Sequence, residues 1–171
     1  MAQVARASAR SEERTVLSPK RFEDYYRLHR DSVLRALALT LRDPDLAAEA
    51  ADEAMARTYQ HWRSVSGYAN PAGWTYRVGL NWARSRFRKR RREVLKSSFE
   101  PPTWDPEPFD PGLARAIGAL PVHARSVVVL RYFLDWSLEE IGQALDIPVG
   151  TAKSRLHRAL QQLRSTLEVQ P

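Results

Sequence analysis

The sequence predicts an all-α protein of two small helical domains joined by a proline-rich segment. Apolar residues recur every three or four positions over most of the chain, which is the period of a helix that buries one face. No stretch shows the strict two-residue alternation of a half-buried strand. Residues 97–111 contain five of the eleven prolines, and proline disfavours helix at and before its own position. We therefore expect a flexible tail over 1–17, a first domain over 18–96, a linker over 97–111, and a second domain over 112–171.

The first domain is expected to contain three helices. The first runs over 19–42, and the residues on its apolar face are Phe22, Tyr26, His29, Val33, Leu37 and Leu41. Asp43 and Pro44 end it and start the next helix, because Asp caps free backbone N–H groups and proline suits the first helical position. That second helix covers 44–62, and the residues expected in the core are Leu46, Ala50, Met55, Tyr59 and Trp62. After a loop over 64–70, Asn70 and Pro71 repeat the capping signature and begin a helix that ends near residue 92.

The second domain is expected to contain four shorter helices, over 112–119, 122–133, 138–145 and 148–166. Ser137 and Glu140 form a capping box, in which each side chain satisfies a free backbone donor of the other residue. The last two helices are separated by a short turn, and their apolar faces pack together through Ile141, Leu145, Ile147, Ala152, Leu156 and Leu163. This is the pattern of a helix-turn-helix, whose second helix enters the DNA major groove.

The last helix pairs an apolar face with a positive, hydrogen-bonding face. Small residues at its start let a phosphate approach the helix N-terminus. Lys153 and Arg158 suit phosphates or guanine acceptors, whereas Ser154 and His157 suit base edges. The candidate DNA-binding residues of this helix are Thr151, Lys153, Ser154, Arg155, His157 and Arg158. A solvated basic face on a helical hairpin is the alternative interpretation.

Charge and composition limit the class of protein. The net charge of +7 favours a polyanionic partner. The absence of cysteine excludes disulfides and thiolate chemistry, and it fits a reducing, cytoplasmic environment. No apolar run approaches the roughly 18 residues of a membrane span, so no membrane association is expected.

Motifs in both halves resemble one family. Residues 120–164 contain LPxxxRxVxxLRYF, SLEEIGQAL and IPVGTAKSRLHRA, and the first half contains FEDYYRLH, DPDLAAEAADEAM and NPAGWTYRVGLNWARSRFRKRRR. Over roughly residues 20–166 the chain resembles bacterial RNA polymerase sigma factors, and within them the small extracytoplasmic-function group. The resemblance implies a subunit that binds the beta-prime and beta subunits of core polymerase and recognises the minus-ten and minus-thirty-five promoter elements. An anti-sigma factor is a further partner that the resemblance allows.

The second helix carries a stripe of carboxylates at helical spacing: Asp45, Glu49, Asp52 and Glu53. Such a stripe repels DNA phosphates, and on its own it is typical of a solvated face. The resemblance implies instead that it docks on a coiled coil of beta-prime, with Asp52 standing where the family has Gln. A metal site is rejected, because no Glu-x-x-His motif accompanies the carboxylates.

The third helix ends in a basic run, with seven Arg or Lys among residues 84–92. Because these like charges repel one another, the run indicates a polyanionic partner that neutralises them. The resemblance implies that the loop over 64–70 and Asn81 hold an unpaired base of the minus-ten strand. Trp74 is expected in the core, since large aromatics at helical spacing usually pack inward. Gly79 lies mid-helix, where glycine costs about 1 kcal/mol. The candidate DNA-binding residues of this helix are Arg77, Asn81, Arg84 and Arg88.

Two other classes of function compete with this interpretation. An enzyme is disfavoured, because no nucleophile motif or glycine-rich phosphate loop occurs and the four histidines are scattered along the chain. We therefore expect no catalytic residue, cofactor or metal. The stronger rival is a stand-alone helix-turn-helix regulator, which would bind an operator as a dimer and would need no acidic face. The acidic linker could lie in a basic polymerase channel or act as a plain spacer.

Overall fold

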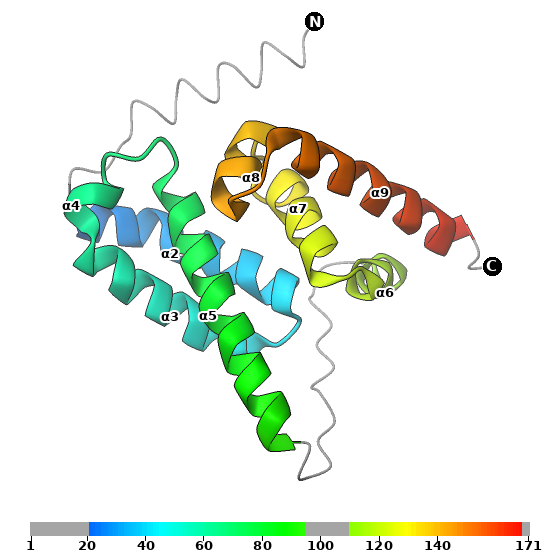
Figure 1. The fold of residues 1–171 in the computed structure, drawn as a ribbon, viewed down its shortest axis with the longest axis horizontal. Coiled ribbons are helices and arrows are strands. Elements are labelled where there is room, and N and C mark those ends of the chain that lie inside the picture. Colours follow the sequence, from blue (N-terminus) through cyan, green and yellow to red (C-terminus); the bar gives the residue numbers. More distant parts are fainter. Residues whose placement is uncertain (1–20, 95–109, 169–171) are drawn as a thin grey trace, which may run out of the picture.

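The computed structural model describes residues 21–94 and 110–168, with side chains over 21–90 and 110–168. The expected tail and nearly all of the expected linker lie outside these ranges. The described chain is helical and contains no strand, which confirms the all-α class and the C-terminal helix-turn-helix (Figure 1). The helices are α2 (Phe22–Leu41), α3 (Pro44–Gln60), α4 (Trp62–Val65), α5 (Pro71–Val94), α6 (Pro111–Ala119), α7 (Val122–Tyr132), α8 (Leu138–Leu145) and α9 (Val149–Glu168).

Side-chain caps set the helix starts that the sequence predicts. The Asp43 carboxylate accepts a hydrogen bond from the Leu46 N–H at 2.9 Å, and the Asn70 amide oxygen accepts one from the Gly73 N–H at 2.9 Å. Both bonds of the capping box on α8 are present. The end of the second helix differs from the expectation: the backbone leaves the helical conformation at His61, and residues 62–65 form the separate short helix α4.

The buried face of the first half differs from the sequence prediction at three aromatic residues. Tyr25 is fully buried, whereas Tyr26 is 38% exposed. Tyr59 is 64% exposed, and Trp74 is half-buried and lies outside the core cluster. At Tyr26 and Tyr59 the reason is a buried polar network, in which the Thr75 hydroxyl bonds the Tyr25 hydroxyl at 2.6 Å and the Thr58 hydroxyl at 2.8 Å. These hydroxyls turn α2 and α3 onto faces that an apolar pattern does not reveal.

Gly79 allows α5 to pass close to the other two long helices of the first half. A Cβ at this position would lie 2.8 Å from Leu37 Cδ1 and 3.1 Å from the Ala50 carbonyl oxygen. The first distance is shorter than real Cβ contacts and the second is tighter than most of them, so a side chain here would require Leu37 and the α3 backbone to shift, and close helix packing explains the mid-helix glycine.

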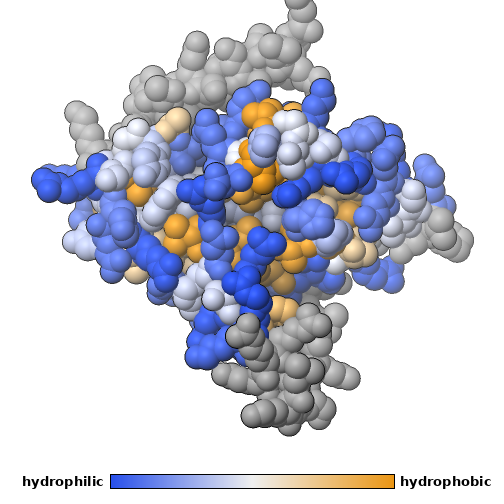
Figure 2. Space-filling view, in the orientation of Figure 1, coloured by the Kyte–Doolittle hydropathy of each residue, from blue (hydrophilic) through white to orange (hydrophobic). Residues whose placement is uncertain are grey.

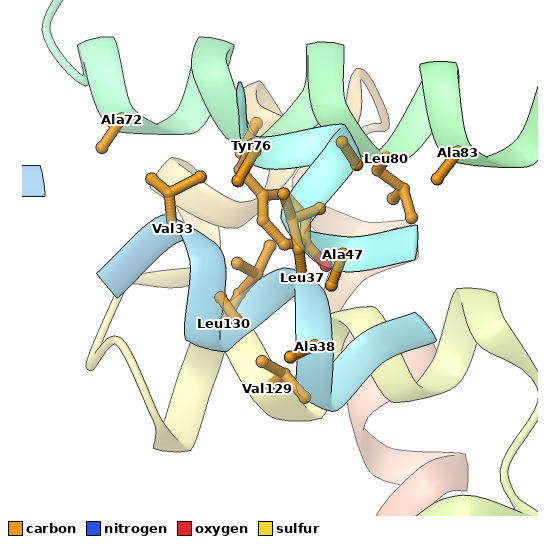
Figure 3. Packing of buried hydrophobic residues seen from close by; sticks show 14 of the residues in the cluster. Val33, Leu37, Ala38, Ala47, Ala72, Tyr76, Leu80, Ala83, Val129 and Leu130 are labelled. Carbon is orange, nitrogen blue, oxygen red and sulfur yellow. The ribbon is translucent and has the colours of Figure 1, made fainter. Parts of the chain in front are cut away.

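The two halves of the chain share one core. Val127 and Leu130 of α7 are fully buried in the same cluster as Val33 and Leu37 of α2. Figure 3 shows the α7 side chains among those of α2 and α5. A second cluster, formed by α6, α7 and α9, contains Ala116, Leu120, Ala124, Val128, Ala159 and Leu163.

The buried Arg125 of α7 binds both halves through backbone carbonyls. Its Nη1 donates to the Thr40 oxygen at 2.6 Å, at the end of α2. Its other nitrogens donate around the end of α6, to the Ile117, Gly118 and Leu120 oxygens at 3.2, 2.9 and 2.7 Å. Helix C-terminal carbonyls carry partial negative charge, so they stabilise a buried cation without a carboxylate. Burial, and then the nearby Arg42, lower the pKa of the Arg125 guanidinium from its usual value.

We expect Arg125→Met to lower the free energy of unfolding by about 2–3 kcal/mol, because it leaves buried carbonyls without their donor. Urea denaturation measures the change. Arg115→Met on α6 is the matched control, since Arg115 is exposed, and it should change stability by no more than about 0.5 kcal/mol. Equal losses in the two variants would contradict the assigned role.

The buried Tyr76 predicts a loss of stability at alkaline pH. Its hydroxyl lies 2.7 Å from Thr40 Oγ1, and burial raises the pKa of Tyr76 to about 12. In the unfolded chain the phenol ionises near pH 10, so its contribution is complete below pH 10 and is lost as the pH rises towards 12. Urea denaturation between pH 9 and 12 should show a fall on the order of 2 kcal/mol from this group. Tyr76→Phe should make the decline shallower, and an unchanged slope would contradict the assignment.

Candidate nucleic-acid interface

The outer face of α9 presents its positive and hydrogen-bonding side chains to solvent. Lys153, Ser154, His157 and Arg158 are exposed, while Thr151 and Arg155 are half-buried. On the opposite face, Ala152, Ala159 and Leu163 are buried against the rest of the second half. The structure therefore brings together, along one helix, all six residues that the sequence selects on α9.

A tight turn between α8 and α9 sets the direction of this face. Asp146 adopts a left-handed conformation with φ of 56°, and the Ile147 N–H donates to the Gly142 oxygen at 2.9 Å. A Cβ at residue 142 would lie 2.9 Å from the Ile147 oxygen, so this close turn requires glycine. The turn lets Ile141 and Ala152 pack together in the core and leaves the basic face of α9 outside.

The candidate DNA residues of the first half lie along α5. Asn81, Arg84 and Arg88 are exposed, whereas Arg77 is half-buried and its guanidinium lies 3.8 Å from the Asp146 carboxylate of the second half. The basic run continues the helix to Val94. Its positive charge therefore extends from an ordered helix.

His123, near the start of α7, is affected by the charges of arginines of both halves. Partial desolvation lowers the pKa of His123, and the positive charges of Arg155, Arg158 and Arg84 lower it further. Arg155 and Arg158 belong to α9, whereas Arg84 belongs to α5. The positive charges of both candidate DNA-binding surfaces therefore act on this one imidazole.

The carboxylates of α3 lie at the surface and bind arginines of their own half. The Asp52 carboxylate lies 3.5 Å from the Arg30 guanidinium, and Glu53 pairs with Arg57 at 2.7 Å. Glu49 lies 3.8 Å from Arg86 and 3.6 Å from Arg90, both in the basic run. Asp45 is exposed. In the described ranges, no cluster of three His, Asp or Glu side chains suits a metal ion, and no helix has the length and apolarity of a membrane span.

A hollow of about 300 Å³ lies where the loop before α5 meets α8. It is lined by Tyr68, Ala69, Asn70, Trp74, Arg77, Gln143 and Ala144. Trp74 therefore lines this hollow, and its predicted place in the core is wrong. The Nδ2 atom of Asn70 is a buried donor without a hydrogen-bond acceptor among the described residues. The loop can be identified from the sequence, whereas its contact with α8 cannot, because nothing local in α8 indicates this contact.

The face in Figure 2 is mainly hydrophilic, and hydrophobic residues show on it in separate patches.

The fold is all-helical and ends in a helix-turn-helix whose second helix is exposed and basic, which is the arrangement found in helix-turn-helix DNA-binding proteins. Residues 112–163 match the family model described as sigma-70, region 4.

Similar proteins define the family more closely. The chain is 35% identical to the RNA polymerase sigma-E factor of Streptomyces coelicolor, with 85% of each chain covered. It is 33% identical to the ECF RNA polymerase sigma factor SigL of Mycobacterium tuberculosis, over 80% of this chain and 84% of SigL. The fold matches the sigma factor RpoE of Bartonella quintana, solved in complex with the anti-sigma factor NepR. The TM-score is 0.75 at 22% identity, over 88% of this chain and 98% of RpoE. The chain belongs to the extracytoplasmic-function group of RNA polymerase sigma factors.

Proposed function

We propose that the chain is a dissociable, non-catalytic initiation subunit that directs core RNA polymerase to promoters with particular minus-ten and minus-thirty-five elements. Its partners are core polymerase, through the beta-prime and beta subunits, and promoter DNA. The observation that carries the proposal is the presence of an exposed basic face on α9 together with a separate carboxylate face on α3. This role places the protein in the cytoplasm, with the chromosome. RpoE of Bartonella quintana is bound by an anti-sigma factor, and we extend such a partner to this chain as part of the proposal.

In this proposal the second half recognises the minus-thirty-five element. Lys153, Ser154, His157 and Arg158 are exposed on successive turns of α9, and their outward direction suits a major groove. In the free chain Ser154 Oγ donates to the Thr151 oxygen at 3.1 Å, and Arg158 Nε donates to the Ser154 oxygen at 3.3 Å. These weak, exposed bonds to the helix's own backbone are readily exchanged for bonds to DNA.

The first half binds polymerase through Asp45, Glu49, Asp52 and Glu53, and it binds the minus-ten region through the loop over 64–70 and the outer face of α5. Asn81 supports an unpaired base, while Arg77, Arg84 and Arg88 bind the adjacent backbone. The carboxylates of α3 are paired with internal arginines, but exposed pairs contribute only about 0–1 kcal/mol. A basic polymerase surface can therefore replace Arg30 or Arg57 at low cost.

One assay distinguishes this proposal from a stand-alone regulator. Purified chain is added to core polymerase and a candidate promoter, and specific transcripts and DNA protection are measured with and without polymerase. A sigma factor gives specific initiation and binds DNA weakly alone. Protection of an operator without polymerase, together with no initiation, would support the regulator instead.

We expect Arg158→Ala to lower discrimination between promoter variants by about 1–3 kcal/mol at one position of the minus-thirty-five element, if Arg158 binds a base edge. Holoenzyme binding to a panel of single-base promoter variants measures this. Arg164→Ala, at an exposed arginine further along α9, is the matched control. A loss that is uniform over the panel would make Arg158 a phosphate contact only.

We expect Glu53→Arg to weaken binding to core polymerase at least tenfold, because it places a positive charge in the carboxylate face and beside Arg57. Glu168→Arg carries the same charge change at the exposed end of α9, so it controls for net charge. Fluorescence anisotropy of the labelled chain with core polymerase measures the affinities. Equal affinity of the two variants would remove Glu53 from the docking face.

A further inference from the structure

We propose that the start of α9 selects one thymine by its methyl group: Gly150 lets the helix approach the base pairs closely, and the Val149 side chain contacts the methyl. This inference rests on the proposed function, and it adds to it an apolar contact that selects one base of the minus-thirty-five element. The polar residues further along α9 select bases by hydrogen bonds, which a methyl group cannot make.

Gly150 is a helical glycine that the fold itself does not require. It lies in the first turn of α9, it is exposed, and its φ is not positive. A Cβ at residue 150 would meet none of the described residues of another element within 4 Å, whereas a Cβ at residue 142 would lie 2.9 Å from the Ile147 oxygen. Glycine inside a helix costs about 1 kcal/mol relative to alanine. The reason for this cost at Gly150 therefore lies outside the free chain, where a ligand approaches the backbone closely.

Gly150 lies on the proposed DNA-binding face of α9. Ser154, His157 and Arg158 follow it by four, seven and eight residues, which is the spacing of one helical face, and all three are exposed. The second helix of a helix-turn-helix contacts base edges with its N-terminal residues. The missing side chain therefore lies where α9 comes nearest to the floor of the major groove, and a Cβ there would hold the helix away from the base edges.

Val149 brings an apolar side chain to the same point. It is 41% exposed, although it lies only one turn before Lys153. One of its methyl groups lies towards α8, since Val149 Cγ2 would be 3.6 Å from a Cβ on Gly142. Valine has one strongly preferred χ1 rotamer in a helix, so the exposed part of the side chain is fixed in direction before DNA binds. The first turn of α9 contains no acidic residue that would repel the DNA.

Thymine is the base that matches this side chain. Its C5 methyl is displayed in the major groove, where apolar side chains contact it. Valine has no side-chain donor or acceptor, so it cannot select a base by its hydrogen-bonding groups. Val149 and His157 are eight residues apart, which is about 12 Å along the helix, or about three to four base pairs at roughly 3.4 Å each. We expect the selected thymine at that separation from the base pair that His157 contacts.

Deoxyuridine substitution tests the inference, because it removes only the methyl group of thymine. The minus-thirty-five element is first selected from a randomised promoter library with holoenzyme, and each of its thymines, on either strand, is then replaced by deoxyuridine. The unmodified chain should lose binding about threefold to fivefold at one thymine, which is the value of one buried methyl group. Val149→Ala should bind the two DNAs equally. Leu167→Ala truncates an apolar residue that is 40% exposed near the far end of α9, so this matched control should keep full sensitivity.

A second variant tests the close approach. Gly150→Ala should raise the melting temperature of the free chain by up to about 4 °C, because alanine is the better helix former. The same variant should weaken holoenzyme binding to the selected promoter roughly tenfold, because base contacts of α9 are lost. Gly142→Ala is the contrasting variant, and it should lower the melting temperature, since its Cβ meets the Ile147 oxygen. Unchanged promoter affinity in Gly150→Ala would overturn the close approach.

The outcomes separate this inference from the proposed function. Specific initiation by the unmodified chain, with no effect of deoxyuridine or with an effect that Val149→Ala keeps in full, would overturn the methyl contact and leave the sigma-factor role intact. A selected element without any A·T pair would do the same. If the unmodified chain gives no specific initiation with core polymerase, the proposed function fails and the inference fails with it.

Discussion

The guanidinium of Arg125 is a buried polar interaction that joins the two halves beside their shared apolar core. Three of its bonds, to Ile117, Gly118 and Leu120, fix the end of α6 against α7 within the second half. Only the bond to Thr40 crosses to the first half. The use of carbonyls in place of a carboxylate also matters, because the buried guanidinium is satisfied at both halves without a second buried charge.

Charged side chains at the surface also find their partners within the chain itself. Glu49 lies against Arg86 and Arg90, so part of the carboxylate face and part of the basic run neutralise each other in the free chain. Asp146 does the same for Arg77 across the two halves. Because these pairs are exposed, each is weak. A polymerase surface that takes the carboxylates would free the arginines for phosphate, which couples the two kinds of binding.

Local chemistry explains which features the sequence could predict. Asp43, Asn70 and Ser137 are strong capping residues, and the helices begin where these caps predict. The choice of Tyr26 over Tyr25 was wrong because hydroxyl pairing between Tyr25 and Thr75 is a contact between distant segments, and a periodic pattern contains no information about it. The shared core was missed for the same reason: an amphipathic helix shows that a face is buried, but not which element covers it. The candidate residues on α9 and α3 could be placed on exposed faces, since polarity at helical spacing does encode exposure.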